Sequence, residues 1–106
     1  MRYFIIGFMG SGKTYFGGLW AAKHEFTFYD LDALIEEEER MAVAEIFKQR
    51  GEDYFREKEA AILRNTDRFH NCIIACGGGT PCFYDNMDWM NRNGVTIFLD
   101  AGVENI

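Results

Sequence analysis

The chain lacks the features that mark membrane-spanning, secreted and nucleic-acid-binding proteins. No apolar run approaches the roughly 20 residues that a helix needs to cross a bilayer, and the apolar start is too short for a signal peptide. Positive charge is also scarce: 11 cationic residues face 17 anionic ones, for a net charge of -6. That charge repels a phosphate polymer. We therefore expect neither a membrane nor a nucleic acid as a partner.

Cysteine is scarce as well, with only Cys72, Cys76 and Cys82 present. An odd number without paired spacing argues against a disulfide framework. A zinc site needs a fourth ligand, and His70 is the only histidine nearby. We interpret the cysteines as buried or partly buried thiols of a cytoplasmic protein, because the cytosol keeps thiols reduced.

No internal repeat or low-complexity linker divides the chain, so residues 1–106 are expected to form one domain. Short apolar segments alternate with segments of helical length. The predicted strands are residues 3–7, 27–29, 72–75 and 95–99, and the predicted helices are residues 13–23, 31–39, 42–49, 52–63 and one that ends at Gly94. In the last helix Phe83, Met87 and Met90 have helical spacing and are predicted to pack in the core. This alternation predicts an α/β three-layer sandwich, with a central parallel sheet and helices on both faces.

Residues 7–14 read GFMGSGKT and match the complete P-loop pattern, with a predicted strand before and a helix after. Glycines let successive backbone N–H groups point at phosphate oxygens, and the helix directs its positive end at the same anion. Lys13 is predicted to reach the β- and γ-phosphates and Thr14 to bind Mg²⁺. The predicted nucleotide-binding residues are Gly10, Ser11, Gly12, Lys13, Thr14 and Tyr15. The alternative is a glycine-rich turn that only precedes a helix.

Two carboxylates, Asp30 and Asp32, follow the second predicted strand. If the backbone is still extended there, the two side chains point the same way. One then serves the Mg²⁺ shell and the other a substrate hydroxyl, because the third strand ends without an acid. The alternative is that the aspartates cap the next helix.

Arg56 and Glu59 are three residues apart on a predicted helix and are therefore neighbours on its surface. Glu59 can fix the guanidinium in one rotamer for a substrate carboxylate, which a planar fork of donors suits. An ordinary surface ion pair is the alternative. Three glycines, residues 77–79, end the third strand and indicate backbone that another group approaches closely. A flexible loop is the alternative there.

Taken together, these motifs resemble shikimate kinase in order and spacing over essentially the whole chain. The matching segments are GFMGSGKT, Asp30-Leu31-Asp32, Glu45-Ile46-Phe47, Gly51-Glu52, Phe55-Arg56-x-x-Glu59 and Gly77-Gly78-Gly79. The P-loop is shared with many kinases, whereas the aspartate pair, the arginine helix and the glycine triplet are more specific as a set.

The resemblance implies transfer of the ATP γ-phosphate to the 3-hydroxyl of shikimate, in chorismate and aromatic amino-acid biosynthesis. It implies that Asp30 supports Mg²⁺ through water, with Thr14 as the direct ligand. Asp32 is implied to contact the shikimate hydroxyls and to act as the catalytic base, beside Lys13. Arg56 is implied to bind the shikimate carboxylate, and Gly78 to offer its backbone N–H. The implied partners are ATP and shikimate, for an enzyme that is a monomer when complete.

The sequence departs from the family pattern in three respects. Gly18 stands where a basic residue is usual, and Tyr15 where a small hydroxyl residue is common. The family also continues past the fourth strand into a lid, a last strand and a helix, and we expect these 106 residues to lack them. A kinase of another small acid, such as gluconate, and a non-catalytic nucleotide-binding fragment stay open as alternatives.

Overall fold

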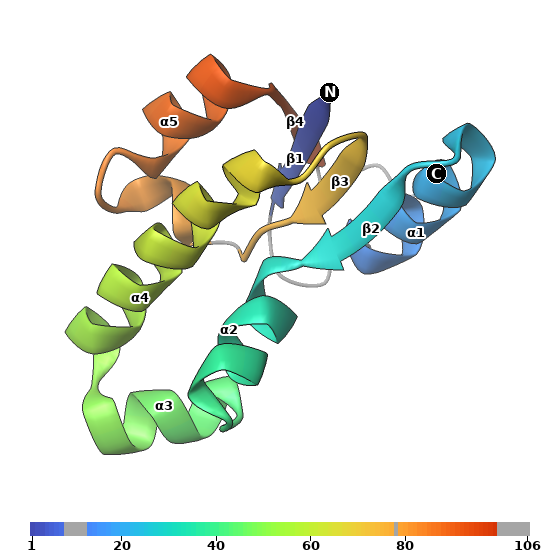
Figure 1. The fold of residues 1–106 in the computed structure, drawn as a ribbon. Coiled ribbons are helices and arrows are strands. Elements are labelled where there is room, and N and C mark those ends of the chain that lie inside the picture. The colour runs from blue at the N-terminus through green and yellow to red at the C-terminus, as the bar shows by residue number, and fades with distance from the viewer. Residues whose placement is uncertain (8–12, 78, 100–106) are drawn as a thin grey trace.

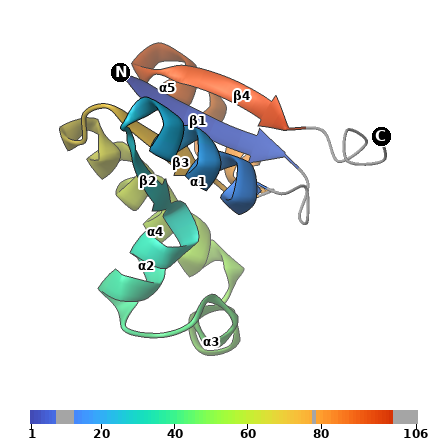
Figure 2. The same cartoon turned by 90° about the vertical axis from the view of Figure 1, so that its right-hand side faces the viewer.

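A computed structural model describes residues 1–7, 13–77 and 79–99 of the chain, with the side chains of residues 13–16 and 99 outside that description. Its centre is a sheet of parallel strands in the order β2-β3-β1-β4 (Figure 1). The strands are β1 Arg2–Gly7, β2 Thr27–Asp30, β3 Cys72–Ala75 and β4 Val95–Leu99. The predicted α/β fold with a parallel sheet is therefore confirmed, and β4 runs beside β1 at one edge (Figure 2).

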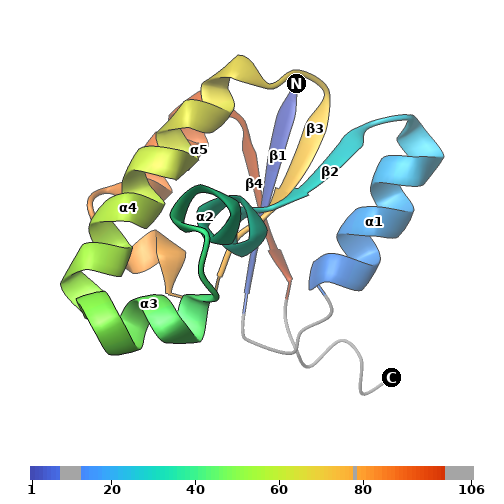
Figure 3. The same cartoon turned by 60° about the horizontal axis from the view of Figure 1, so that its bottom comes forward.

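Helices cover both faces of this sheet. They are α1 Lys13–His24, α2 Leu31–Glu39, α3 Val43–Arg50, α4 Glu52–Asn65 and α5 Asn86–Asn93, with single turns of 3-10 helix η1 Thr66–Arg68 and η2 Thr80–Cys82. Helix α1 lies on one face, and α2, α4 and α5 lie on the other (Figure 3). Helix α3 packs on α2 and α4, away from the strands.

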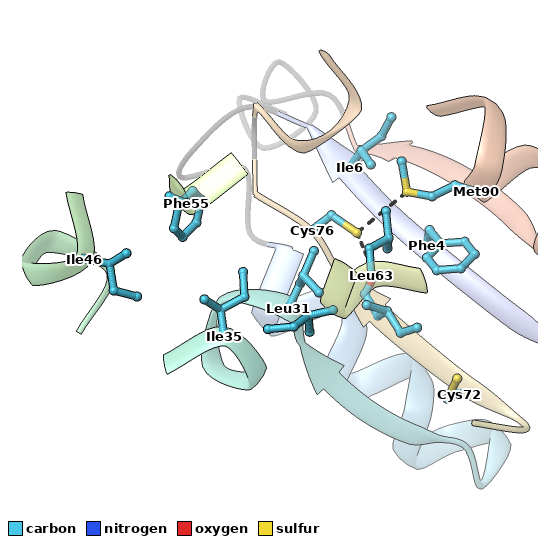
Figure 4. Close-up of a cluster of buried hydrophobic side chains, with 12 residues drawn as sticks. Phe4, Ile6, Leu31, Ile35, Ile46, Phe55, Leu63, Cys72, Cys76 and Met90 are labelled. Carbon is cyan, nitrogen blue, oxygen red and sulfur yellow. Dashed lines mark hydrogen bonds between the residues drawn. The ribbon is translucent and has the colours of Figure 1, made fainter. Parts of the chain in front are cut away.

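The alternation of side chains along β1 explains why there are two cores. Phe4 and Ile6 point to the face of α2, α4 and α5, where they join Leu31, Leu63 and other buried residues (Figure 4). Ile5 points the other way, into a smaller cluster under α1. A strand that is apolar on both faces is what a parallel sheet between two helical layers requires.

The segment before α5 differs from the prediction. Phe83 precedes the helix, which begins at Asn86, and the Met87 side chain is 38% exposed. Only Met90 of the predicted apolar stripe is fully buried, with its sulfur 3.9 Å from that of Cys76 (Figure 4). Tyr84 and Asp85 both have left-handed backbone angles, with φ of 50° and 57°. Two such residues in succession prevent a helix from continuing back to Phe83.

The strand register brings the predicted functional segments to one end of the sheet. Asp30 at the end of β2 is level with Ala75 at the end of β3, and Ala75 is level with Ile5 of β1. In an open α/β sheet, ligands bind beyond the carboxyl ends of the strands. The described parts of residues 7–14, 30–32 and 77–79 therefore lie at the edge of the sheet where a ligand is expected.

Candidate active site

The predicted phosphate loop joins the end of β1 to the start of α1. Gly10, Ser11 and Gly12 lie outside the described residues, as do the side chains of Lys13, Thr14 and Tyr15. The structure describes the context: β1, an inner strand of the sheet, ends at Gly7, and α1 begins at Lys13. The strand before and the helix after, which a P-loop needs, are thus present, and the roles of the six residues remain predictions.

Asp30 caps helix α2. Its Oδ1 accepts hydrogen bonds from the backbone N–H of Asp32 at 2.9 Å and of Ala33 at 3.4 Å. The capping alternative considered for this motif is therefore correct for Asp30, and it satisfies two N–H groups at the start of the helix. Both bonds fall on one oxygen, and carboxylate oxygens are the ligands that Mg²⁺ prefers. The cap is thus compatible with the predicted metal role.

Asp32 reaches the site from the first turn of α2, not from extended backbone. The condition for the two side chains to point the same way, an extended backbone from Asp30 to Asp32, is not met, since α2 already begins at Leu31. Instead the helix carries Asp32 toward the glycine segment, where its Oδ1 lies 3.7 Å from the position of a Cβ added to Gly77.

The surroundings of Asp32 favour its protonated form. Burial is the largest cause of a raised pKa, and the negative charges of Asp30, Glu59 and Glu36 raise the pKa further. The positive charge of Arg56 lowers the pKa but does not cancel the other effects. A carboxylate with a raised pKa is a better proton acceptor near neutral pH than an ordinary aspartate.

Arg56 is held from several sides. Its Nη1 donates to Glu59 Oε1 at 3.0 Å, which confirms the predicted pairing, and its Nε lies 3.5 Å from Glu52 Oε2. The guanidinium carbon lies 4.5 Å from the ring centre of Phe83 and 5.4 Å from that of Phe55. The Glu59 side chain is 1% exposed and that of Arg56 is 16% exposed, so this is not an ordinary surface ion pair.

The glycine segment approaches Arg56 closely. A Cβ added to Gly79 would lie 2.7 Å from Arg56 Nη2, nearer than a side chain can approach without displacement. At Gly77 the same test finds only ordinary contacts, with Thr80 and Asp32. The prediction of bare backbone approached by another group therefore holds at Gly79. Gly78 lies outside the described residues.

One cavity collects these groups. It has a volume of about 230 Å³, large enough for a small ring compound. Its lining residues are Asp32, Val43, Phe47, Phe55, Arg56, Glu59, Gly77 and Gly79. The Nε of Arg56 is buried and has no hydrogen-bond partner among the described residues. A cation, a carboxylate and aromatic walls in one small cavity suit a polar ring that carries an acid group and hydroxyls.

Sequence reasoning missed two residues of this site. Phe83 was assigned to a core helix, yet its ring covers the Arg56 guanidinium. Thr80 follows the glycine triplet, and its hydroxyl donates to Glu59 Oε2 at 2.7 Å. No sequence signal marks a buried threonine, because its partner lies 21 residues away along the chain.

The described residues contain no group of three or more His, Cys, Asp or Glu side chains arranged to hold a metal ion. No helix in this part of the chain has the length and apolar character that crossing a membrane requires.

Comparisons with known proteins agree with one another. The family model described as shikimate kinase matches residues 9–106. A shikimate kinase of Bacteroides thetaiotaomicron is 49% identical over 101 residues, which is 95% of this chain and 58% of that protein. The crystal structure of the shikimate kinase from Bacteroides thetaiotaomicron superimposes with a TM-score of 0.90, over 92% of this chain and 56% of that chain.

A more distant structure, shikimate kinase from Acinetobacter baumannii in complex with shikimate, is 28% identical, with a TM-score of 0.89. It is matched over 92% of this chain and 55% of that chain. The chain therefore spans less than two thirds of the length of these relatives.

Proposed function

The chain belongs to the shikimate kinase family, and on that premise we propose that it forms the core of an enzyme that transfers the γ-phosphate of ATP to the 3-hydroxyl of shikimate. The observation that carries the proposal is the cavity at the carboxyl end of the sheet. Asp32 and Arg56 both line it, and β1 ends at the same edge of the sheet, immediately before the predicted P-loop. A relative in this family is described in complex with shikimate, which supports the choice of acceptor.

Arg56 binds the carboxylate of the acceptor in this proposal. A guanidinium offers five N–H donors in a rigid plane, and the bond to Glu59 uses one of its terminal nitrogens. Glu59 and Phe83 fix the plane before the substrate arrives, so that little side-chain entropy is lost on binding. Gly79 leaves room for the guanidinium, and the N–H of Gly78 is proposed to contact the substrate.

Asp32 acts on the hydroxyl in this proposal. The half-buried carboxylate orients the acceptor hydroxyl and takes its proton as the oxygen attacks phosphorus. Its raised pKa brings it closer to the pH at which the enzyme works, and proton transfer is most effective there. The neighbouring acids that raise this pKa therefore contribute to the proposed chemistry.

The phosphate side rests on the P-loop sequence. Lys13 is proposed to contact the β- and γ-phosphates, with Gly10 to Thr14 and Tyr15 around the nucleotide. Thr14 and Asp30 would hold Mg²⁺, directly and through water respectively, and the ion when bound neutralises charge on the phosphate oxygens. The N-terminus of α1 adds a positive partial charge at the same position.

A coupled ADP-release assay tests this function. The acceptors are shikimate, gluconate and a nucleoside monophosphate. Two proteins are compared. One consists of residues 1–106, and the other is a chimera in which residues 1–106 are followed by the C-terminal part of the Bacteroides thetaiotaomicron relative that this chain does not match. We expect the chimera to release ADP from ATP when shikimate is the acceptor, and not with either of the other two acceptors. Preferential ADP release with gluconate or a nucleoside monophosphate would contradict the proposal.

A further inference from the structure

A set of buried polar side chains lies directly behind Arg56. Glu59, Thr80 and Asn86 are each fully buried, although charged and polar groups are costly to remove from water. Glu59 uses both carboxylate oxygens: Oε1 accepts from Arg56 and Oε2 accepts from the Thr80 hydroxyl at 2.7 Å. The Thr80 hydroxyl is therefore the second anchor of the carboxylate that orients Arg56.

Thr80 is itself fixed from behind. Its backbone carbonyl accepts from the side-chain amide of Asn86 at 2.9 Å, and the Asn86 oxygen accepts from Arg64 at 2.7 Å. Arg64 also donates to the backbone carbonyl of Tyr84 at 2.6 Å. Arg64 belongs to α4, the same helix as Arg56 and Glu59. Residues 80–86 are therefore attached to that helix at two positions, Glu59 and Arg64.

The network connects the two sides of the cavity. Helix α4 supplies the guanidinium, and the segment that begins at Gly77 supplies the backbone facing it. Thr80 joins them, because its N–H also bonds the Gly77 carbonyl at 3.2 Å. Glu59, Thr80 and Asn86 each have hydrogen-bond partners in this network, and a buried polar network that is satisfied in this way specifies one arrangement of its side chains.

We propose that Thr80 is a positioning residue for the acceptor-binding guanidinium: its hydroxyl fixes Glu59, and Glu59 fixes the plane of Arg56 against the glycine segment. This proposal rests on the proposed function, in which Arg56 binds the acceptor carboxylate. Without the hydroxyl, Glu59 Oε2 loses its buried donor, and the carboxylate turns toward other donors. Arg56 then loses its fixed orientation, and acceptor binding weakens while nucleotide binding does not.

Three variants of this chain test the proposal. Thr80→Val removes the hydroxyl at nearly constant volume, and Thr80→Ser keeps it. Thr66→Val is the matched control, because Thr66 is also 1% exposed or less and donates to the Leu63 carbonyl at the end of the same helix, away from Arg56. We expect Thr80→Val to raise the dissociation constant for shikimate on the order of tenfold. The affinity for an ATP analogue should stay within about twofold, since that ligand does not contact Arg56.

Thr80→Ser should bind shikimate with the affinity of the wild type. Thr66→Val should also bind shikimate with wild-type affinity, even if this substitution lowers the melting temperature. Equal losses for shikimate and nucleotide, or a Ser variant as weak as the Val variant, would show that Thr80 serves packing alone and overturn the proposal.

A second readout separates this proposal from the proposed function. The ¹⁵N–¹H signal of Arg56 Nε, assigned by its loss in Arg56→Lys, reports the order of the guanidinium without any ligand. We expect one sharp signal in the wild type and Thr80→Ser, and a signal broadened or exchanging several-fold faster with water in Thr80→Val. A wild type that does not bind shikimate contradicts the proposed function only. An Arg56 signal unaffected by Thr80→Val overturns the positioning role, whatever the substrate is.

Discussion

Asp32 is a half-buried carboxylate with the negative charges of Asp30, Glu59 and Glu36 around it and only Arg56 opposing them. Because its pKa in the folded state lies above the ordinary value of 3.8, the folded state holds its proton more tightly than the unfolded state does. As pH rises through the window between those two pKa values, the contribution of Asp32 to stability therefore falls. At neutral pH its charge opposes folding, as is common where a group is kept for chemistry.

The activity of Asp32→Asn tests the proposed base. In the chimera defined above, this variant should keep its affinity for ATP and lose on the order of 10²-fold or more in kcat, because the amide accepts no proton. The wild-type kcat should fall as pH drops through the raised pKa of Asp32. Normal turnover of the variant at saturating shikimate would remove Asp32 from the chemistry.

The same substitution should stabilise the fold. We expect Asp32→Asn to melt at a higher temperature than the wild type at pH 7. The difference should shrink as pH falls through the raised pKa of Asp32, because the wild-type carboxyl then becomes protonated in the folded state. Asp30→Ala is the contrasting variant, since it removes the α2 cap and should cost about 1 kcal/mol. Thermal melts at two pH values decide the matter, and a lower melting temperature for Asp32→Asn at pH 7 would contradict this reading of its surroundings.

Among the single elements, helix α1 contains two adjacent glycines, Gly17 and Gly18, whose surroundings differ. A Cβ added to Gly17 would collide with the Phe28 ring of β2, whereas one added to Gly18 meets nothing within 4 Å. Gly17 thus permits the close approach of α1 to the sheet. Gly18 has no such role in the structure, although it stands where the family usually has a basic residue.

Gly18→Ala should therefore raise the free energy of unfolding by about 0.5–1 kcal/mol, because alanine loses less backbone entropy in a helix interior. Gly17→Ala should lower it, because the added methyl group displaces Phe28 or the helix. Urea unfolding of both variants measures the two effects. A shift of the same sign at both positions would mean that helix propensity, rather than the contact with Phe28, controls this helix.

The strands and most helices were predictable because the residues that pack in the two cores recur at regular spacing along the sequence. Phe55, Glu59, Ile62 and Leu63 have helical spacing within the predicted helix 52–63, and all four are buried. The start of α5 was mispredicted, because a spacing of four and three residues suits a helix wherever that helix begins. The left-handed residue Tyr84, whose carbonyl is held by Arg64, breaks the pattern, and residue spacing does not encode that contact.

The site was predictable where chemistry is local and unpredictable where it depends on packing. Arg56 and Glu59 are neighbours on any helix, so their pairing followed from spacing alone. Asp32 lies at the carboxyl end of the sheet as predicted, but it lies in a helix rather than in extended backbone. A spacing of two residues suits both an extended strand and a helix cap. Thr80 and Phe83 enter the site only because the segment after β3 turns back over α4.

For the whole molecule, β4 is an edge of the sheet among the described strands, with Val95 42% and Phe98 58% exposed. An exposed apolar edge strand favours pairing with another chain. We therefore expect residues 1–106, prepared by themselves, to associate more readily than the chimera.

Residues 1–106 should bind nucleotide without turning over shikimate at the rate of the chimera. The predicted phosphate-binding residues are local to 7–15, so residues 1–106 should bind an ATP analogue, and Lys13→Ala should weaken that binding at least about tenfold. Turnover of shikimate should be far slower than in the chimera, because phosphoryl transfer also needs further positive charge and exclusion of water. Equal kcat values for the two proteins would refute this division of labour.

The cavity between Asp32 and Arg56 is proposed to bind shikimate through its carboxylate, and a titration of this chain with shikimate and shikimate methyl ester measures that interaction. Wild type should bind the acid much more tightly than the ester, since the ester lacks the charge that pairs with Arg56. In Arg56→Lys the difference should largely disappear, because lysine cannot form the paired contact, while affinity for the ATP analogue stays unchanged. Equal affinity of the wild type for acid and ester would mean that the cavity does not recognise the carboxylate of shikimate.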